Sequence, residues 1–257
     1  MILCLDVGNT TIFGGVFKDS TIQLRFRYAT SNECSTDQLG LFLKNVLREN
    51  IIQPENITAI CLSCVVPSLS NTIEQACQQY FNITPLQIKP GVKTGLKLLI
   101  KNPQELGSDI IANAIAATHH FPNRDIVIVD FGTATVLSAV SAKHEYLGSV
   151  IMAGIKVSLQ ALGESAAKLI DVAIEKPQHV LGKATEPTLQ AGLYYGHLGA
   201  VKEILYQLKT EVFAGKELVV IATGGYADLY QQEELFILHI PDLVLHGLRL
   251  ILSKNMT

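Results

Sequence analysis

The sequence lacks a strong charge of either sign, and it lacks a long apolar run. Its 257 residues carry 20 Lys and Arg against 23 Asp and Glu, a formal net charge of −3, with a pI near 6.2. This balance gives no electrostatic reason to expect nucleic acid or an anionic membrane surface as a partner. No apolar run reaches the roughly 18 residues that cross a bilayer, and Asp6 interrupts the N-terminal run. We therefore expect neither a membrane helix nor a signal peptide.

Cysteine is sparse, and linkers are missing. Five cysteines, an odd number without a secretory signal, indicate a reducing compartment, so we expect a cytoplasmic protein. Cys61 and Cys64 are the one close pair, and in a strand this spacing places the two thiols on opposite faces, which disfavours a metal site. The chain has no low-complexity tract or run of like charges. With 48% hydrophobic residues it can form one large domain or two small ones.

The first sixteen residues contain a motif around which the rest of the chain is organised. The apolar run 2–5 stops at Asp6, a glycine turn follows, and a second apolar run begins at Ile12, which predicts two strands joined by a turn. Backbone N–H groups of such a turn can cradle phosphate oxygens. A carboxylate repels phosphate, so Asp6 would act through a metal ion or its water. Taken alone, the stretch also fits a plain hairpin with turn-forming Asp and Asn.

The same order of residues recurs at positions 126–140. Asp130 and Gly132 follow an apolar run and precede small hydroxyl residues and a second apolar run, and Asp130 lies 124 residues after Asp6. This repeat indicates two similar halves that face each other and offer one turn each to the same ligand. In this respect the chain resembles the actin, sugar-kinase and heat-shock-chaperone ATPase superfamily. The resemblance implies an α/β fold of two ribonuclease-H-like halves, duplicated βββαβα-type units, facing across a nucleotide cleft. The halves would be residues 1–121 and 122–257.

Periodicity and capping signals predict the other elements. In the first half we expect strands at 21–29, 57–65 and 85–89, an irregular segment at 91–101, and helices at 35–49, 67–80 and 103–120. Ser35 and Asn102 would cap the first and third of these helices. In the second half we expect strands at 126–131, 135–141, 145–153, 217–223 and 236–240, and helices at 156–169, 185–212 and 241–254. Thr185 would cap the second of these helices, and another helix would follow Gly225 with its N-terminus near a nucleotide.

Asp109 is an unusual residue for the interior of a predicted helix, because Asp is a poor helix former there. Gly107 and Ser108 precede it and carry little bulk, so a ligand could approach the carboxylate. Taken alone, Asp109 also fits a solvated surface acid.

Further motifs resemble one family within this superfamily, the type III pantothenate kinases. They run in that family's order and are Asp6-Val-Gly-Asn-Thr10, Ser63-Cys-Val-Val-Pro67, Asn102-Pro103, Gly107-Ser-Asp109, Asp130-Phe-Gly-Thr-Ala134, Gly182-Lys-Ala-Thr185, Gln190-Ala-Gly192 with Tyr195-Gly196, and Thr223-Gly-Gly225. The resemblance implies ATP-dependent phosphorylation of pantothenate to 4′-phosphopantothenate, the first step of coenzyme A biosynthesis.

The resemblance also implies roles for individual residues. Asp109 would take the proton from the pantothenate hydroxyl, and Asp130 would coordinate a monovalent cation, K⁺ or NH₄⁺. Mg²⁺ would bridge the ATP phosphates, held largely by water and phosphate. ATP would contact Thr133 and the first turn, which comprises Asp6, Val7, Gly8, Asn9, Thr10, Thr11, Ile12 and Phe13. The substrate would contact Ile100, Gly107, Ser108, Asp109, Ile110 and Thr185.

Two positions depart from the family. Members usually carry Arg directly after the catalytic acid, where this chain has Ile110, and Tyr at the position that aligns with Ile100. The chain could therefore be a kinase of the same fold for another small hydroxylated substrate, or a non-catalytic, nucleotide-binding regulatory relative. The retained Asp109 favours the enzymes.

The stretch 190–199 is rich in small and aromatic residues and suits packing against a partner, so we expect a homodimer, as in the family.

Overall fold

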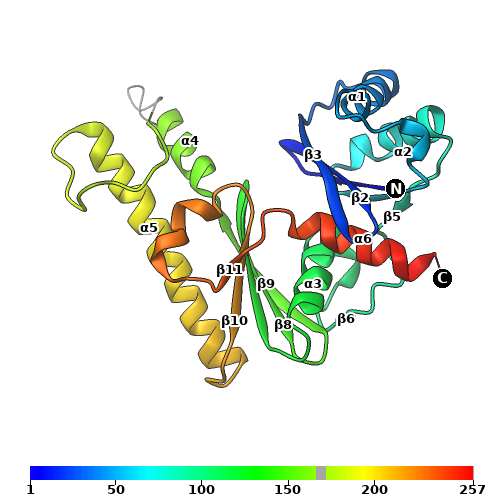
Figure 1. Ribbon diagram of the computed structural model, residues 1–257. Helices are drawn as coiled ribbons and strands as arrows, with labels where there is room; N and C mark the ends of the chain where they lie inside the picture. The colour runs from blue at the N-terminus through cyan, green and yellow to red at the C-terminus, as the bar shows by residue number, and fades with distance from the viewer. Residues whose placement is uncertain (166–171, 257) are drawn as a thin grey trace. The chain divides into compact units, whose positions relative to one another are not determined.

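The computed structural model describes residues 1–165 and 172–256, which divide into two compact units. Unit 1 comprises Met1–Leu96, Lys101–Ala116 and the residues from Leu243 onward. Unit 2 comprises Lys97–Ile100 and the described part of Ala117–Asp242. Each unit is built on one mixed sheet (Figure 1).

The sheet of unit 1 has the strand order β3-β2-β1-β4-β5. β1 pairs antiparallel with β2, and β2 with β3, whereas β4 runs parallel to both β1 and β5. Side chains alternate along β1, so that Leu3 and Leu5 enter one core cluster and Cys4 enters another on the opposite face. The strands are β1 (Ile2–Val7), β2 (Thr11–Lys18), β3 (Thr21–Ala29), β4 (Ala59–Cys64) and β5 (Leu86–Gln87).

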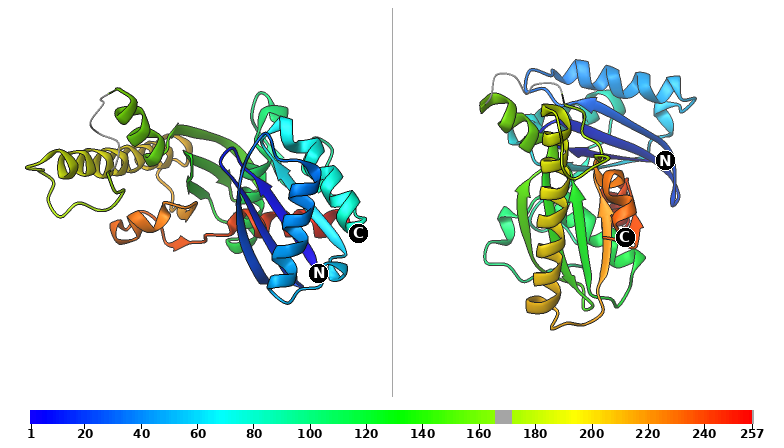
Figure 2. Two further views of the ribbon diagram at one scale, coloured as in Figure 1. Left: turned by 90° about the horizontal axis from the view of Figure 1, so that it is seen from above. Right: turned by 90° about the vertical axis from the view of Figure 1, so that its left-hand side faces the viewer.

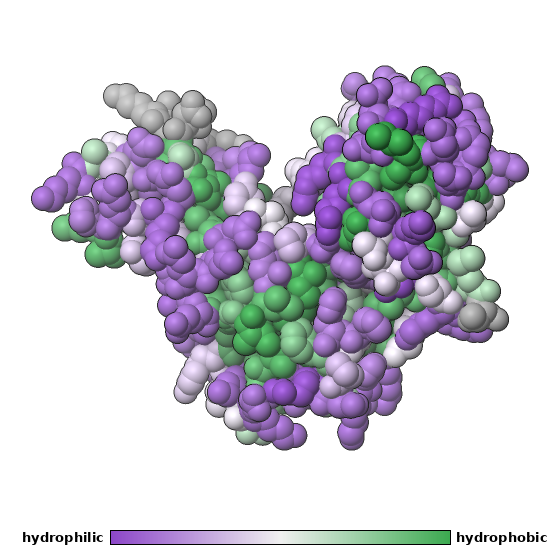
Figure 3. All heavy atoms as spheres, viewed as in Figure 1, coloured by the Kyte–Doolittle hydropathy of each residue, from purple (hydrophilic) through white to green (hydrophobic). Residues whose placement is uncertain are grey.

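Two helices, α1 (Thr36–Glu49) and α2 (Pro67–Phe81), contribute to the core cluster that contains Leu3 and Leu5. The capping predictions for both are confirmed. Ser35 forms a capping box with Gln38 at the start of α1, and Pro67 occupies the first turn of α2. Hydrophilic side chains cover most of the outer surface over α1 (Figure 3), as expected of a helix with one buried face. A short 3₁₀ helix, η1 (Pro54–Asn56), precedes β4.

The opposite face of this sheet is covered by α3 (Ser108–His120) and α6 (Leu243–Asn255). The C-terminal helix α6 thus belongs to unit 1, whereas the sequence placed it in the second half. Its buried leucines pack, together with α3, on apolar side chains of β1, β2 and β4, a face that must be covered wherever in the sequence the covering helix comes from. α6 crosses α3 at Gly247, where a side chain would collide with the Ala112 carbonyl.

The sheet of unit 2 has the strand order β11-β10-β7-β8-β9-β6. Read from the other edge, the five strands β9-β8-β7-β10-β11 correspond in order and direction to β3-β2-β1-β4-β5 of unit 1. The sixth strand, β6, is added beside β9. The duplicated α/β fold expected from the sequence is therefore confirmed. The strands are β6 (Lys97–Leu98), β7 (Ile126–Phe131), β8 (Ala134–Ser141), β9 (Glu145–Ala153), β10 (Val219–Thr223) and β11 (Leu238–His239).

One helix of unit 2, α5 (Thr185–Gln207), lies along this sheet (Figure 2). It contributes Leu193, Tyr194 and Leu198 to a core cluster with β7 and β8. A π-helical turn, Leu208–Val212, follows it. α4 is described as Ile155–Ser165, and the last four positions of the helix expected at 156–169 lie outside the described residues. No helix within the described ranges is both long and apolar enough for a bilayer.

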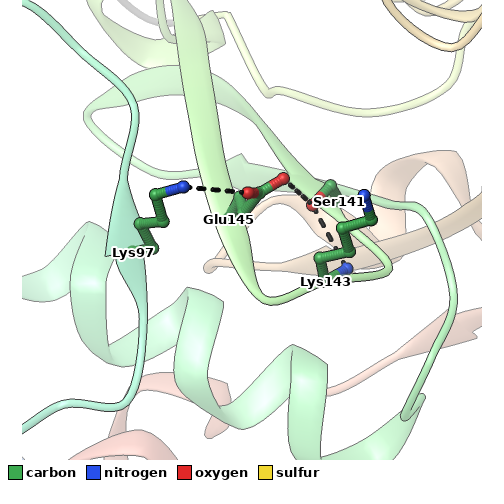
Figure 4. Close-up of polar contacts among 4 residues, drawn as sticks. All are labelled: Lys97, Ser141, Lys143 and Glu145. Atoms are coloured by element: carbon green, nitrogen blue, oxygen red, sulfur yellow. Dashed lines mark hydrogen bonds and ion pairs between the residues drawn. The ribbon is translucent and has the colours of Figure 1, made fainter.

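The segment expected to be irregular at 91–101 contains the edge strand β6. The Leu99 N–H donates to the Tyr146 carbonyl at 2.9 Å, continuing the ladder with β9. The Lys97 ammonium lies 3.3 Å from the Glu145 carboxylate, which also accepts a hydrogen bond from the Ser141 hydroxyl at 3.0 Å (Figure 4). These contacts fix the backbone just before Ile100. The pairing joins segments nearly fifty residues apart, so no local pattern predicts it.

Three predicted helix N-termini differ from the structure, one in its position, one in its cap and one in the type of helix. α3 begins at Ser108, because Pro103–Glu105 form a separate 3₁₀ turn, η2, and Leu106 is extended; the Asn102 side chain makes no capping bond. The cap of α5 is Ala184, so Thr185 lies inside the helix and does not cap it. The segment after Gly225 forms a 3₁₀ helix, η4 (Ala227–Glu233), and not an α-helix.

Candidate active site

The first glycine turn lies in unit 1 and is held on a rigid frame. Asp6 is the penultimate residue of β1, and the Gly8 N–H donates to the Thr11 carbonyl at 3.0 Å. The Thr30 hydroxyl donates to the Gly8 carbonyl at 2.7 Å and ties the turn to β3. Residues 9 and 10 are exposed. The turn therefore presents polar side chains and backbone groups to a ligand without having to refold.

Three residues assigned to this turn from the sequence have buried side chains. Val7, Ile12 and Phe13 are at most 9% exposed and belong to the cores on the two faces of the sheet. They could contact a nucleotide only through their backbone groups.

The second glycine turn lies in unit 2 at the equivalent place. Asp130 is the penultimate residue of β7, as Asp6 is of β1. The Gly132 N–H donates to the Ala134 carbonyl at 3.1 Å, so this turn is one residue shorter than the first. Thr133, assigned to ATP, is exposed within it. The structure brings Asp130 and Thr133 together in one turn.

Two glycines allow oxygen atoms to gather around this second turn. The Gly154 N–H donates to the Thr133 carbonyl at 3.1 Å, and a side chain at Gly154 would collide with that carbonyl and with the one of Gly132. Gly224 has φ +90°, and a Cβ there would lie 2.5 Å from the Asp130 carboxylate. The Phe131 carbonyl lies beside Gly224 as well, and carboxylate and carbonyl oxygens are the ligands that hard cations prefer.

Asp109 lies in the first turn of α3, in unit 1. Its Oδ1 accepts a hydrogen bond from the Ile110 N–H at 2.8 Å, and it folds back so closely that a side chain at Gly107 would collide with it. Burial raises the pKa of the Asp109 carboxyl above its ordinary value, and the backbone hydrogen bonds oppose that rise in part. Asp109 is therefore not the solvated surface acid that the sequence left open. The hydroxyl of Ser108, directly before it, forms a hydrogen bond with the hydroxyl of Ser63.

The remaining assigned residues lie in both units. Gly107, Ser108 and Ile110 surround Asp109 in unit 1, whereas Ile100 follows β6 in unit 2. Thr185 is exposed as the first residue of α5. Its neighbours line a cavity of about 860 Å³ in unit 2, together with other polar residues that include Lys176, His179, Lys183, Glu186 and Gln190.

The cysteine pair has the geometry expected from its spacing. Cys61 belongs to the core under α3 and α6, whereas Cys64 packs against the core on the α1 and α2 side. Burial raises the pKa of Cys61 to about 12, so its thiol is unreactive at neutral pH. In the described part of the chain, no group of three or more His, Cys, Asp or Glu side chains could hold a metal ion.

Three residues of these sites received no role from the sequence: Ser63, Gly154 and Gly224. Ser63 pairs with Asp6 across β1 and β4, and the glycines approach backbone carbonyls of the second turn. Ser63 and Gly224 stand in motifs quoted for the family resemblance, and Gly154 directly follows a predicted strand, which was the available signal. Their partners are distant in sequence, so only the fold reveals what they do.

Two sheets of one topology, each with an acid and a glycine turn at the end of its central strand, define the class of the actin and sugar-kinase fold. Solved structures with a similar fold support this assignment of the fold. The chain superposes on a ROK hexokinase from Thermus thermophilus with TM-score 0.50, 14% identity, and coverage of 100% and 99% of the two chains. A Baf family transcriptional activator from Campylobacter jejuni gives TM-score 0.62, 19% identity and coverage of 99% and 98%. At these identities the likeness concerns the fold alone.

Sequence relatives identify the family within that class. The model of the type III pantothenate kinase family matches residues 2–207. A type III pantothenate kinase of Legionella pneumophila is 48% identical over 255 residues, which cover 99% of both chains. The chain belongs to the type III pantothenate kinase family.

Proposed function

We propose that this protein transfers the γ-phosphoryl group of ATP to pantothenate, giving 4′-phosphopantothenate and ADP, the first step of coenzyme A biosynthesis. The observation that carries the proposal is the full-length match to the family. The half-buried carboxylate of Asp109, at the start of a helix and beside two small residues, supports it.

The two glycine turns bind the nucleotide in this proposal. Backbone N–H groups and the exposed side chains of Asn9 and Thr10 meet the phosphates in unit 1, and Thr133 contacts ATP from unit 2. Asp6 would hold a magnesium ion or its water, since its carboxylate would repel the phosphates directly. Bound magnesium would neutralise phosphate charge.

The chemical step uses Asp109 as base. The pantothenate hydroxyl oxygen attacks the γ-phosphorus, its proton passes to the Asp109 carboxylate, and the bond from phosphorus to the bridging oxygen breaks to release ADP. The raised pKa suits this role, because it makes the carboxylate a stronger proton acceptor. Gly107 leaves the approach to the carboxylate open.

A monovalent cation would be held at the second turn by Asp130 and by backbone carbonyls near Gly154 and Gly224. Turnover should then rise severalfold with potassium or ammonium and stay low in sodium, measured at constant ionic strength and saturating ATP. The control is Asp130→Asn, which removes the charge and should remove the preference. Equal rates in all three salts would contradict a cation site there.

A second candidate function is phosphorylation of a different small hydroxylated substrate. Ile110 and Ile100 favour it, because both put aliphatic side chains where the resemblance implies polar contacts to pantothenate. Thr185 would remain as a polar contact.

The test is ATP consumption with and without pantothenate, with the product identified by mass. We expect pantothenate-dependent ADP release and a product heavier by one phosphoryl group, lost in Asp109→Asn. Nucleotide turnover that requires another alcohol would support the second candidate. Nucleotide binding without turnover on any acceptor would support a regulatory relative.

We further propose that the protein works as a homodimer in the cytoplasm. On α5 the space beside Gly192, Gly196 and Gly199 is open, and Tyr195 is 37% exposed on the same stretch. Such a face lets a partner helix approach closely. The five cysteines, all in the described part of the chain, are free thiols, which suits a reducing compartment.

A further inference from the structure

Two buried serines from distant parts of unit 1 form a hydrogen bond. The hydroxyl oxygens of Ser63 and Ser108 lie 2.9 Å apart, and the residues are 45 positions apart in sequence. Ser63 is fully buried and Ser108 is 8% exposed. Because a buried hydroxyl without a partner is costly, each serine strongly favours the position in which the other can reach it.

Ser63 connects this serine pair to the first glycine turn. It lies on β4 in register with Asp6 on β1, and the ladder continues where the Val65 N–H donates to the Val7 carbonyl at 3.0 Å. Register partners on parallel strands project to the same face of the sheet. That face also carries Cys4 and Cys61 and is covered by α3 and α6. Asp6 and Ser63 therefore project toward the side on which α3 lies.

Ser108 connects the serine pair to Asp109. It is the first residue of α3, and Asp109 follows it directly. The Asp109 carboxylate is fixed to its own helix by the Ile110 N–H and by its close approach to Gly107. The position of the carboxylate therefore follows the position of the helix N-terminus, which the serine pair joins to β4.

We infer that Ser63 and Ser108 are positioning residues, whose hydrogen bond sets the Asp109 carboxylate in place relative to the glycine turn that begins at Asp6. The inference rests on the proposed function, in which Asp109 is the base and that turn holds the phosphates. Ser63 is fully buried and acts only through its hydrogen bond, and this positioning role of the Ser108 hydroxyl is separate from the substrate contact that the family resemblance implies for Ser108. A small shift of a catalytic group lowers the rate of the chemical step much more than it weakens ground-state binding.

The experiment compares Ser63→Ala, Ser108→Ala and the double variant. Each single variant should lower kcat about fivefold, the scale of one neutral hydrogen bond, while KM for ATP stays within twofold. The double variant should have a kcat no lower than the worse single variant, because the bond is already lost in each. Ser70→Ala is the matched control. Ser70, on α2 of the same unit, accepts a hydrogen bond from Gln87 at 2.7 Å, and its loss should leave kcat unchanged.

Stability separates positioning from simple support of the fold. A single variant leaves one buried hydroxyl unpaired, whereas the double variant leaves none, so its resistance to urea should return toward the wild type. Under our inference its kcat stays low all the same. A double variant that regains both stability and wild-type kcat would overturn the inference, as would single variants with unchanged kcat.

Wild-type protein and Asp109→Asn, assayed beside these variants, separate this inference from the proposed function. No turnover of pantothenate by the wild type, or full turnover by Asp109→Asn, would overturn the proposed function and the inference with it. An active wild type and an inactive Asp109→Asn, with serine variants that keep normal kcat, would overturn the inference alone.

Discussion

At Asp109 catalysis and burial have opposite requirements. The proposed reaction needs the charged carboxylate, whereas burial favours the protonated form. Its folded-state pKa is raised, so ionisation of this carboxyl is less favourable in the folded protein than in the unfolded chain and lowers the free energy of unfolding. The contribution of Asp109 to stability is therefore most favourable when it is protonated, below its ordinary pKa near 3.8, and is lost as pH rises through the folded pKa.

Asp109→Asn should then separate stability from activity. The amide keeps the shape and can still accept the Ile110 N–H bond, so at pH 7 the melting temperature should equal or exceed that of the wild type. The kcat for pantothenate should fall at least about a hundredfold, the low end for loss of a general base. Thermal unfolding near pH 4 should show a smaller difference between the two proteins. A variant clearly less stable than the wild type at pH 7 would contradict this account of burial.

The pH dependence of turnover tests the same carboxyl group. Because proton transfer needs the ionised form, kcat should fall in acid with a midpoint above the ordinary carboxyl value of 3.8. The measurement is kcat against pH at saturating substrates, restricted to the range in which unfolding curves show a folded enzyme. A midpoint at or below 3.8 would contradict a raised pKa.

Ile110 is the residue at which substrate recognition can be altered. Ile110→Arg would place a charged donor beside Asp109, and KM for pantothenate should fall about tenfold, the scale of one charge-assisted hydrogen bond. KM for ATP should stay unchanged. Ile111→Arg is the matched control, because Ile111 is also half-buried in α3 but packs against the core that contains α6. It should not improve pantothenate use. A folded Ile110→Arg enzyme with no lower KM would favour a substrate other than pantothenate.

At the scale of elements, Glu233 joins three segments of unit 2. Its carboxylate accepts hydrogen bonds from the Tyr194 hydroxyl on α5 at 2.7 Å and from Lys176 in the preceding loop at 2.8 Å. Lys202, also on α5, lies 3.7 Å away. The Lys176 hydrogen bond, followed by that of Tyr194, lowers the pKa of Glu233. The loop that leads to Thr185 is thereby held to α5 and η4.

Glu233→Gln should lower the free energy of unfolding by about 1 kcal/mol at pH 7, a value kept small because Lys176 is 44% exposed. Since the folded-state pKa is lowered, the stabilisation is present above the ordinary value of 4.5 and is lost as pH falls through the folded pKa. Urea denaturation of the two proteins should therefore converge in acid. Glu234→Gln, at the exposed neighbouring residue, should match the wild type at both pH values. A difference that persisted undiminished in acid would exclude the charge of Glu233 as its cause.

At the scale of the whole molecule, the open face of α5 predicts a dimer. Light scattering at micromolar concentration should give twice the chain mass of 28.0 kDa. Gly196→Glu puts a charged side chain into the open space beside this glycine and should give monomers. Tyr206→Glu, at a residue that is 62% exposed further along α5, is the control and should stay dimeric. A wild-type monomer would contradict the proposal.

Local patterns in the sequence were sufficient for the central elements of both units. The Asp-x-Gly turns, the strands around them, the Ser35 cap and Pro67 at a helix start are each encoded within a few residues, by alternation, glycine and capping chemistry. The repeat of one pattern near Asp6 and Asp130 indicated two similar halves, and the superfamily resemblance that it carries implied the duplicated fold. The start of α3 was wrong because a proline in a first turn fits a 3₁₀ turn as well as an α-helix.

The tertiary structure alone decided which distant segments meet. α6 covers the sheet of unit 1, β6 pairs with β9 of unit 2, and Ser63 reaches Ser108. None of these contacts has a signature within a window of sequence. An apolar face can be covered by any helix of suitable amphipathicity, a sheet edge can pair with any extended segment, and a buried hydroxyl can pair with any donor or acceptor. Which partner is chosen depends on burying all such surfaces at once.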